Sequence, residues 1–243
     1  MKPSKTSLNP LSIIADTCRY WSKYTWRIIF LTAVVAIPGS FIRQVQFDSV
    51  NDASIIASLA GLYLSIALTW AFFNEDELKQ HKFASIYINS SSRFLPYLLS
   101  SIYFVITIMP IVFGIMIIIL ALSGQVPMYF VLLGAVLGLL ELYLVVRFSL
   151  ATTLVVQNKI SAFNSMRLSW EVTKGLVLKI AFAWGIILTA IVVFSGLLLS
   201  GLELITFFRE NIYAQAAING LLLTFMLPLL IGFGVQIVKR IEK

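Results

Sequence analysis

The feature that most constrains this chain is the length of its uncharged apolar stretches. No Asp, Glu, Lys or Arg occurs in residues 94–140, 180–202 or 211–238. A helix that crosses a bilayer needs about 20 mostly apolar residues, so these three stretches contain at least four such helices. The chain is 59% hydrophobic and 12% charged, whereas soluble domains are about 25% charged. The main solvent of this chain is therefore lipid.

The apolar segments divide into six predicted transmembrane helices. Continuous apolar runs are typical of spanning helices, whereas the strands of a membrane barrel alternate at every second residue. Pro110 inside the third span predicts a kink, because proline removes one backbone hydrogen bond. The predicted fold class is an all-α polytopic membrane protein, with a single integral membrane domain over 1–243. The spans are expected at about 26–42, 53–73, 95–122, 128–155, 176–199 and 213–238.

The distribution of basic residues predicts the orientation of these spans. All of the 18 Lys and Arg residues except Arg43 and Arg209 fall within, or beside, segments on one side of the predicted topology. Cytoplasmic loops of membrane proteins are enriched in Lys and Arg, and acidic residues have little effect. We therefore expect a multi-pass protein of the cell membrane with both termini on the cytoplasmic side.

Polar segments that precede the odd-numbered spans have the pattern of amphipathic surface helices, at about 10–25, 79–94 and 160–174. Such helices lie in the interface, with the apolar face in the acyl chains and the basic face toward phosphates. Each segment leads a pair of spans. The chain is therefore predicted to contain three repeated helical hairpins, each led by a surface helix.

Side chains on these segments supply candidate contacts. In the third segment, four residues at helical spacing form a stripe that we expect to face the bilayer. They are Phe163, Met166, Trp170 and Thr173. In the first segment, Cys18 belongs to the apolar face, which favours packing over modification. Contacts to anionic lipid headgroups at the cytoplasmic face, to a protein partner or to a second copy are predicted for Arg19, Lys23, Arg167, Trp170 and Lys174.

The composition excludes several classes of function. The net charge of +7 comes from residues that flank apolar segments, so we expect no nucleic-acid binding, which needs a separate basic patch. The chain has one cysteine, Cys18, and one histidine, His81. These are too few for a disulfide framework or a cysteine-based metal cluster, and they exclude most zinc sites. The sequence contains no glycine-rich phosphate loop and no catalytic-triad motif. We expect no metal, no cofactor and no catalytic residue, and we interpret His81 and the acids at 75–77 as a solvated loop.

One stretch, 145–188, carries a motif of a known family. An arginine ends a span, an alanine follows, and Ser-Trp and Lys-Gly precede the next span; the matching residues are Arg147, Ala162, Ser169, Trp170, Lys174 and Gly175. The stretch resembles the membrane-domain family associated with glycerophosphoryl diester phosphodiesterases and related uncharacterised six-helix proteins. Segments 9–31 and 93–105 are also similar, whereas Gln157 and Val172 depart from the pattern. The resemblance implies a six-helix fold without phosphodiesterase activity, because a catalytic barrel needs about 200 further residues outside the bilayer.

Glu141 is the candidate functional residue within the membrane. It lies near the middle of the fourth span, where a charge costs roughly 2.5–3.5 kcal/mol on insertion scales. We expect it to be protonated or paired with a polar group of another helix, for which the candidates are Ser101, Asn219 and Thr224. Arg147 lies about 240° further around the helix, so we expect it to reach phosphates or the third surface helix instead.

Three functional hypotheses remain. The favoured one is a non-catalytic envelope scaffold that binds lipid or a partner through the surface helices. The alternative is a small transporter or exporter, with Glu141, Pro110 and Pro38 along its pathway. A membrane enzyme acting on lipid headgroups is the least favoured, because the sequence shows no cluster of acids or histidines at one interface.

Overall fold

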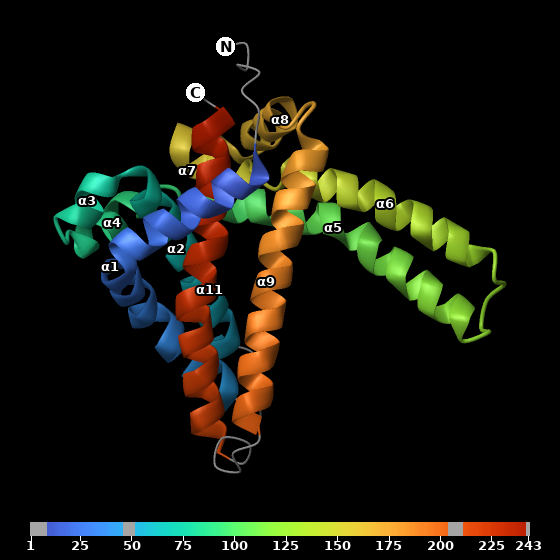
Figure 1. Cartoon of the computed structure of the whole chain (residues 1–243), viewed down its shortest axis with the longest axis horizontal. Helices are drawn as coiled ribbons and strands as arrows, with labels where there is room; N and C mark the ends of the chain where they lie inside the picture. The colour runs from blue at the N-terminus through green and yellow to red at the C-terminus, as the bar shows by residue number, and fades with distance from the viewer. Residues whose placement is uncertain (1–8, 46–51, 204–210, 242–243) are drawn as a thin grey trace. The chain divides into compact units, whose positions relative to one another are not determined.

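The computed structural model describes residues 9–45, 52–203 and 211–241, and all regular elements in these ranges are helices. Six segments are long and apolar enough to cross a membrane: α1, α2, α5, α6 with α7, α9 and α11. The predicted all-α polytopic fold is therefore confirmed. The helices in Figure 1 are α1 (Pro10–Val45), α2 (Asp52–Phe73), α3 (Glu75–Lys79), α4 (Phe83–Ser91), α5 (Phe94–Leu122), α6 (Phe130–Phe148), α7 (Ala151–Asn158), α8 (Ala162–Val172), α9 (Val177–Glu203) and α11 (Ile212–Ile241).

Three helices are interrupted near predicted boundaries. Helix α1 is kinked at Tyr24, where φ is −118° and ψ is 17°, close to the expected passage from surface helix to first span. In the segment expected at 79–94 as a surface helix, the helix is α4, and a turn in which His81 has a left-handed conformation with φ of 55° separates it from α3. The span expected at 128–155 is divided between α6 and α7. The predicted fourth span nevertheless corresponds to one candidate span, Phe130–Asn158, which runs over both α6 and α7.

The chain forms two compact units, and each is described by itself. The first unit comprises residues 1–94 and 182–243, and the second comprises 95–181. The single membrane domain expected over the whole chain stays a prediction. Arg209 and the side chain of Arg43, which also entered the predicted orientation, lie outside the described residues.

In the first unit, α1 packs against α2 and α11, and α4 packs against α2. Helices α1 and α11 approach closely at Gly220, where an added Cβ would lie 2.9 Å from Ser40 Oγ and 3.0 Å from Ile37 Cα. Small residues at helix contacts permit such close approach in membrane proteins. Large apolar side chains from all four helices fill the centre, among them Ile28, Leu68, Phe72, Ile86 and Val235.

Two tyrosines attach α4 to its neighbours. Tyr87 donates its hydroxyl to the Leu31 carbonyl at 2.7 Å, and Tyr63 donates to the Tyr87 carbonyl. The two rings are stacked with centroids 5.8 Å apart. Burial and, to a smaller extent, the neighbouring Tyr63 together raise the pKa of Tyr87 to about 12, because both effects disfavour the phenolate.

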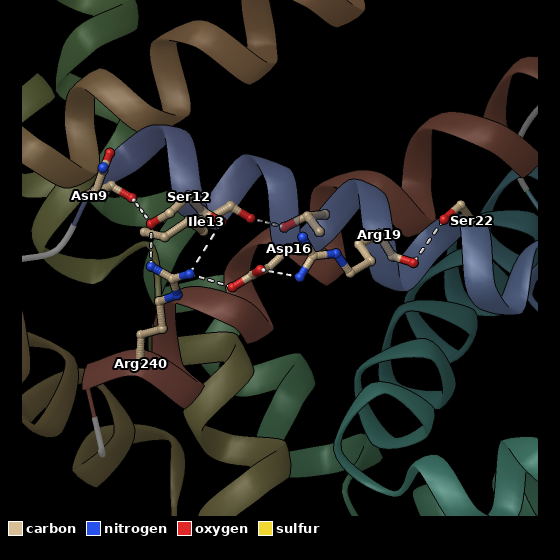
Figure 2. A network of polar contacts seen from close by, with 8 residues as sticks. Asn9, Ser12, Ile13, Asp16, Arg19, Ser22 and Arg240 are labelled. Atoms are coloured by element: carbon tan, nitrogen blue, oxygen red, sulfur yellow. Dashed lines mark hydrogen bonds and ion pairs between the residues drawn. The ribbon is translucent and has the colours of Figure 1, made fainter.

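Polar contacts join the beginning of α1 to the end of α11. Figure 2 shows Arg240 donating to Ser12 and pairing with Asp16, whose other oxygen lies 3.8 Å from Arg19. Arg240 also donates to the Ser12 carbonyl at 3.3 Å. Asp16 and Arg240 are separated by 224 positions in the sequence. The amphipathic first part of α1 is thereby fixed to the last spanning helix.

The acidic segment after α2 is also organised by hydrogen bonds. Lys239 Nζ lies 3.1 Å from Glu75 Oε1. Glu77 accepts from Asn89 Nδ2 at 3.0 Å and from Ser85 Oγ at 3.2 Å, and these contacts tie α3 to α4. The interpretation of this segment as a solvated loop was therefore wrong for Glu75 and Glu77.

In the second unit, α5 and α6 form an antiparallel hairpin (Figure 1). The two helices meet at Gly134, where an added Cβ would lie 2.6 Å from Ile118 Cγ1 and 2.7 Å from the Gly114 carbonyl oxygen. Their outer sides carry exposed apolar side chains such as Ile106 and Leu139. An apolar outer side is typical of helices that face lipid, since lipid tails are as apolar as leucine.

Candidate functional site

Helix α8 packs within the second unit through small and hydroxyl-bearing side chains. The Ser161 hydroxyl caps its N-terminus by accepting from the Asn164 amide at 3.4 Å. The side chains that α8 buries are Ala162, Ser165 and Ser169, and its C-cap residue Thr173 is buried as well. The predicted lipid-facing stripe was therefore wrong at Thr173, which is fully buried, whereas Phe163 is 70% exposed. A face of small side chains lets α8 lie close to α6 and α7.

Arg147, at the end of α6, lies in this contact. Its side chain is 3% exposed, Nη1 donates to Thr173 Oγ1 at 3.2 Å, and the guanidinium lies 4.0 Å from the Trp170 ring centroid. The Tyr143 ring lies 5.6 Å away on the same helix. No carboxylate pairs with Arg147 among the described residues, and its Nε has no hydrogen-bond partner there. The Arg147 guanidinium is therefore stabilised by cation–π contacts and one hydroxyl group instead of an ion pair.

The backbone of Arg147 is held by the same helix. The Ser169 hydroxyl donates to the Arg147 carbonyl at 2.7 Å, at the point where α6 ends. A carbonyl at a helix end has no partner within its own helix, so this hydroxyl stabilises the break before α7. Of the two expectations for Arg147, contact with phosphates or with the third surface helix, the structure shows the second, and the sequence did not identify Thr173 as the partner. The available signal was the i, i+4, i+8 spacing of Ser165, Ser169 and Thr173, which places three hydroxyls on one face.

The opposite face of α8 alternates aromatic and basic side chains. Three of its members follow the i, i+4, i+7 spacing of a single helix face, and the fourth lies in the turn directly after the helix. We call them the outer stripe: Phe163, Arg167, Trp170 and Lys174. All four are exposed, Trp170 least at 37%. Arg167 Nε lies 3.2 Å from Glu171 Oε1, an exposed pair of a kind that contributes about 0.3–0.5 kcal/mol. The structure thus places both basic residues among the aromatic ones.

Glu141 is buried in the second unit. Its side chain is 4% exposed, and Oε2 has no hydrogen-bond partner among the described residues. Of the expected partners, Ser101 is half-buried on α5, while Asn219 and Thr224 belong to the first unit. Thr224 donates to the carbonyl of Gly220 in its own helix at 2.8 Å. No described hydrogen bond joins Glu141 to any of these three residues.

The other predicted contact residues lie in the first unit. Arg19 and Lys23 are exposed on α1, and Lys23 Nζ lies 5.2 Å from the Tyr24 ring centroid. His81 and Cys18 are exposed as well. Within the described ranges, no three His, Cys, Asp or Glu side chains form a group that could hold a metal ion.

Comparisons with known proteins assign no relative to this arrangement. No family model matches the chain, and neither the curated proteins nor the solved structures provide a match. The resemblance to the phosphodiesterase-associated membrane domain therefore rests on the sequence motif alone and stays a prediction.

Proposed function

We propose that this chain is a non-catalytic membrane component that binds anionic lipid headgroups at the cytoplasmic face of the cell membrane, with both termini on that face. The observation that carries the proposal is the outer stripe of α8, in which exposed aromatic and basic side chains alternate. Aromatic rings prefer the headgroup level of a bilayer. A basic residue near an anionic surface contributes about 1 kcal/mol to binding.

The buried side of α8 supports the same proposal. Arg147, Ser169 and Thr173 fix the helix against the end of a spanning segment. The outer stripe is consequently presented in one orientation, which lowers the entropic cost of binding a surface. Arg147 itself is enclosed beneath Trp170, so its role in this proposal is to position α8 and not to contact the headgroup. The family resemblance agrees in fold, since it implies a six-helix membrane domain.

Native mass spectrometry of the full chain, titrated with phosphatidylglycerol and with phosphatidylcholine, tests the proposal. The variant R167Q/K174Q removes both charges of the outer stripe, and R167K/K174R is the matched control that keeps them. We expect the preference for phosphatidylglycerol to fall roughly 25-fold in the first variant, at about fivefold per charge, and to persist in the control. Equal preference in the two variants would overturn the proposal.

Glu141 supports a second candidate, a proton-coupled transporter. A buried carboxyl group with an oxygen that has no partner is the kind of intramembrane group that marks ion pathways. Proton flux into proteoliposomes should then be lost in Glu141→Gln and retained in Glu171→Gln, which changes an exposed carboxylate. Absence of flux through the unmodified protein would eliminate this candidate.

A further inference from the structure

The basic residues of α1, in the first unit, divide into paired and unpaired ones. Arg19 Nη1 lies 3.8 Å from a carboxylate oxygen of Asp16. Neither Lys23 nor Arg27 has a carboxylate partner or a side-chain hydrogen bond within the described ranges. Lys23 Nζ lies 5.2 Å, and the Arg27 guanidinium carbon 5.9 Å, from the centroid of the same ring, that of Tyr24. Two positive charges therefore converge on one ring without a carboxylate to neutralise them.

Contacts around this ring place the basic pair where two spanning helices end. The Tyr24 ring lies 4.8 Å from that of Tyr20, measured between centroids. Lys239, close to the C-terminus of α11, lies 5.6 Å from the Tyr20 ring centroid and donates to the Phe72 carbonyl at 2.8 Å. Helix α2 ends at the next residue. The basic pair therefore lies at the headgroup level of a bilayer that these helices cross, where basic side chains reach phosphates.

Beyond the kink at Tyr24, α1 carries exposed apolar side chains on the face of Arg27. Arg27, Phe30 and Val34 follow the i, i+3, i+7 spacing of one helix face, and Phe30 and Val34 are 57% and 55% exposed. These seven residues cover about 10 Å at ~1.5 Å per residue, within the ~15 Å of half a hydrocarbon core. Positive charge followed by exposed apolar surface matches the order of phosphate and acyl chain in a lipid. A free phosphate ion would need no apolar extension.

We infer that Lys23 and Arg27 bind the phosphate of one anionic glycerophospholipid, whose acyl chain lies along Phe30 and Val34. The Arg27 guanidinium can donate two parallel hydrogen bonds to phosphate oxygens, and the Lys23 ammonium adds a second charge. Two cations repel the ammonium group of a zwitterionic headgroup, so the lipid is anionic. The inference rests on the proposed lipid-binding function, but it assigns a second site on a different unit of the chain.

The dissociation constant of phosphatidylglycerol from the delipidated full chain tests this site. K23Q/R27Q removes the two unpaired charges. R19Q/K79Q is the matched control, because it removes two charges of the same unit that each lie beside a carboxylate. Native mass spectrometry should show one lipid bound roughly 25-fold more weakly in K23Q/R27Q, at about fivefold per charge, and unchanged binding in R19Q/K79Q. Equal weakening in the two variants would overturn the inference, because net charge alone would then explain it.

Two further measurements do not depend on the folding of K23Q/R27Q. K23R/R27K keeps both charges and one guanidinium, and it should bind the lipid at the unmodified stoichiometry; loss of one lipid would contradict recognition by this pair of charges. On the unmodified chain, glycerophosphoglycerol, which is the headgroup without acyl chains, should not displace the lipid when added in molar excess. Displacement would assign the site to a free phosphate and overturn the lipid as its occupant.

The outer stripe of α8 provides the comparison with the proposed function. R167Q/K174Q should leave the lipid at Lys23 and Arg27 in place, and combining it with K23Q/R27Q should remove one further lipid. Binding that is lost in R167Q/K174Q and unchanged in K23Q/R27Q would refute this inference and leave the proposed function standing. The reverse result would refute the role of the outer stripe and support the site on α1. The two failures are therefore distinguishable.

Discussion

Replacement of Thr173 by valine removes the single hydroxyl that accepts from the buried Arg147 guanidinium. Thr173 Oγ1 lies 2.7 Å from the Ser169 carbonyl and 3.2 Å from Arg147 Nη1. A hydroxyl has one hydrogen, so it donates to Ser169 and uses a lone pair to accept from Arg147. Since Arg147 is only 3% exposed, water does not readily replace the lost acceptor.

The expected loss of stability in Thr173→Val follows from the charge on the Arg147 donor. Hydrogen bonds to charged groups contribute about 1.5–3 kcal/mol, so the free energy of local opening of α8 should fall by about 2 kcal/mol. This corresponds to roughly 30-fold faster amide exchange. The assay is hydrogen–deuterium exchange of the full chain in nanodiscs, followed in peptides that cover 162–172.

A matched control separates this contact from the loss of any threonine hydroxyl. Thr107 is half-buried on α5, and its hydroxyl makes an exposed hydrogen bond to the Tyr103 carbonyl of the same helix at 2.9 Å. Thr107→Val should change exchange in α8 by no more than about twofold, because exposed substitutions usually stay within about 0.5 kcal/mol. Exchange in α8 that rises less than threefold in Thr173→Val, or equally in the control, would refute the assigned role of Thr173.

Two further predictions concern the hairpin of the second unit and the attachment of α4. Gly134→Ala should destabilise the protein by about 1–3 kcal/mol, because the new Cβ would lie 2.7 Å from the Gly114 carbonyl oxygen; Gly138→Ala meets open space and should be neutral or stabilising by up to about 1 kcal/mol. Thermal unfolding in detergent compares the two, and equal melting temperatures would contradict the close approach. The pKa of Tyr87 is raised in the folded state to about 12, so its stabilising contribution should be complete below the unfolded pKa of about 10 and be lost as pH rises from about 10 to 12. Unfolding measured against pH should show this loss in the unmodified protein and not in Tyr87→Phe; parallel curves would contradict it.

The spanning helices could be predicted from the sequence because their formation depends on local composition. A single segment in lipid can satisfy its backbone hydrogen bonds only as a helix, because a lone strand would leave its N–H and C=O groups unpaired. Each apolar run therefore forms a helix. The passage from surface segment to first span was likewise predicted close to Tyr24, where the polar pattern changes to an apolar one. The place of Arg147 within the fourth span followed from the same local pattern.

The orientation of α8 was decided by tertiary contacts. The pattern predicted that Thr173 would share the bilayer-facing stripe, but the helix instead buries its hydroxyl face against Arg147 and exposes Phe163 with the basic residues. A buried guanidinium and a free carbonyl at a helix end both need polar partners. The need to pair these polar groups outweighs the preference of a short helix for burying its largest apolar side chains. This need can be recognised only when the contact between α6 and α8 is known.

The contacts between distant segments were also beyond sequence reasoning. The pairing of Asp16 with Arg240, and of Glu75 with Lys239, joins positions far apart in the chain, and no local pattern specifies such partners. An apolar groove between α1, α9 and α11 likewise exists only because these three helices converge. The sequence by itself determined which segments enter the bilayer, since transfer into lipid depends on each segment alone; the tertiary structure determined which faces meet, since packing depends on pairs.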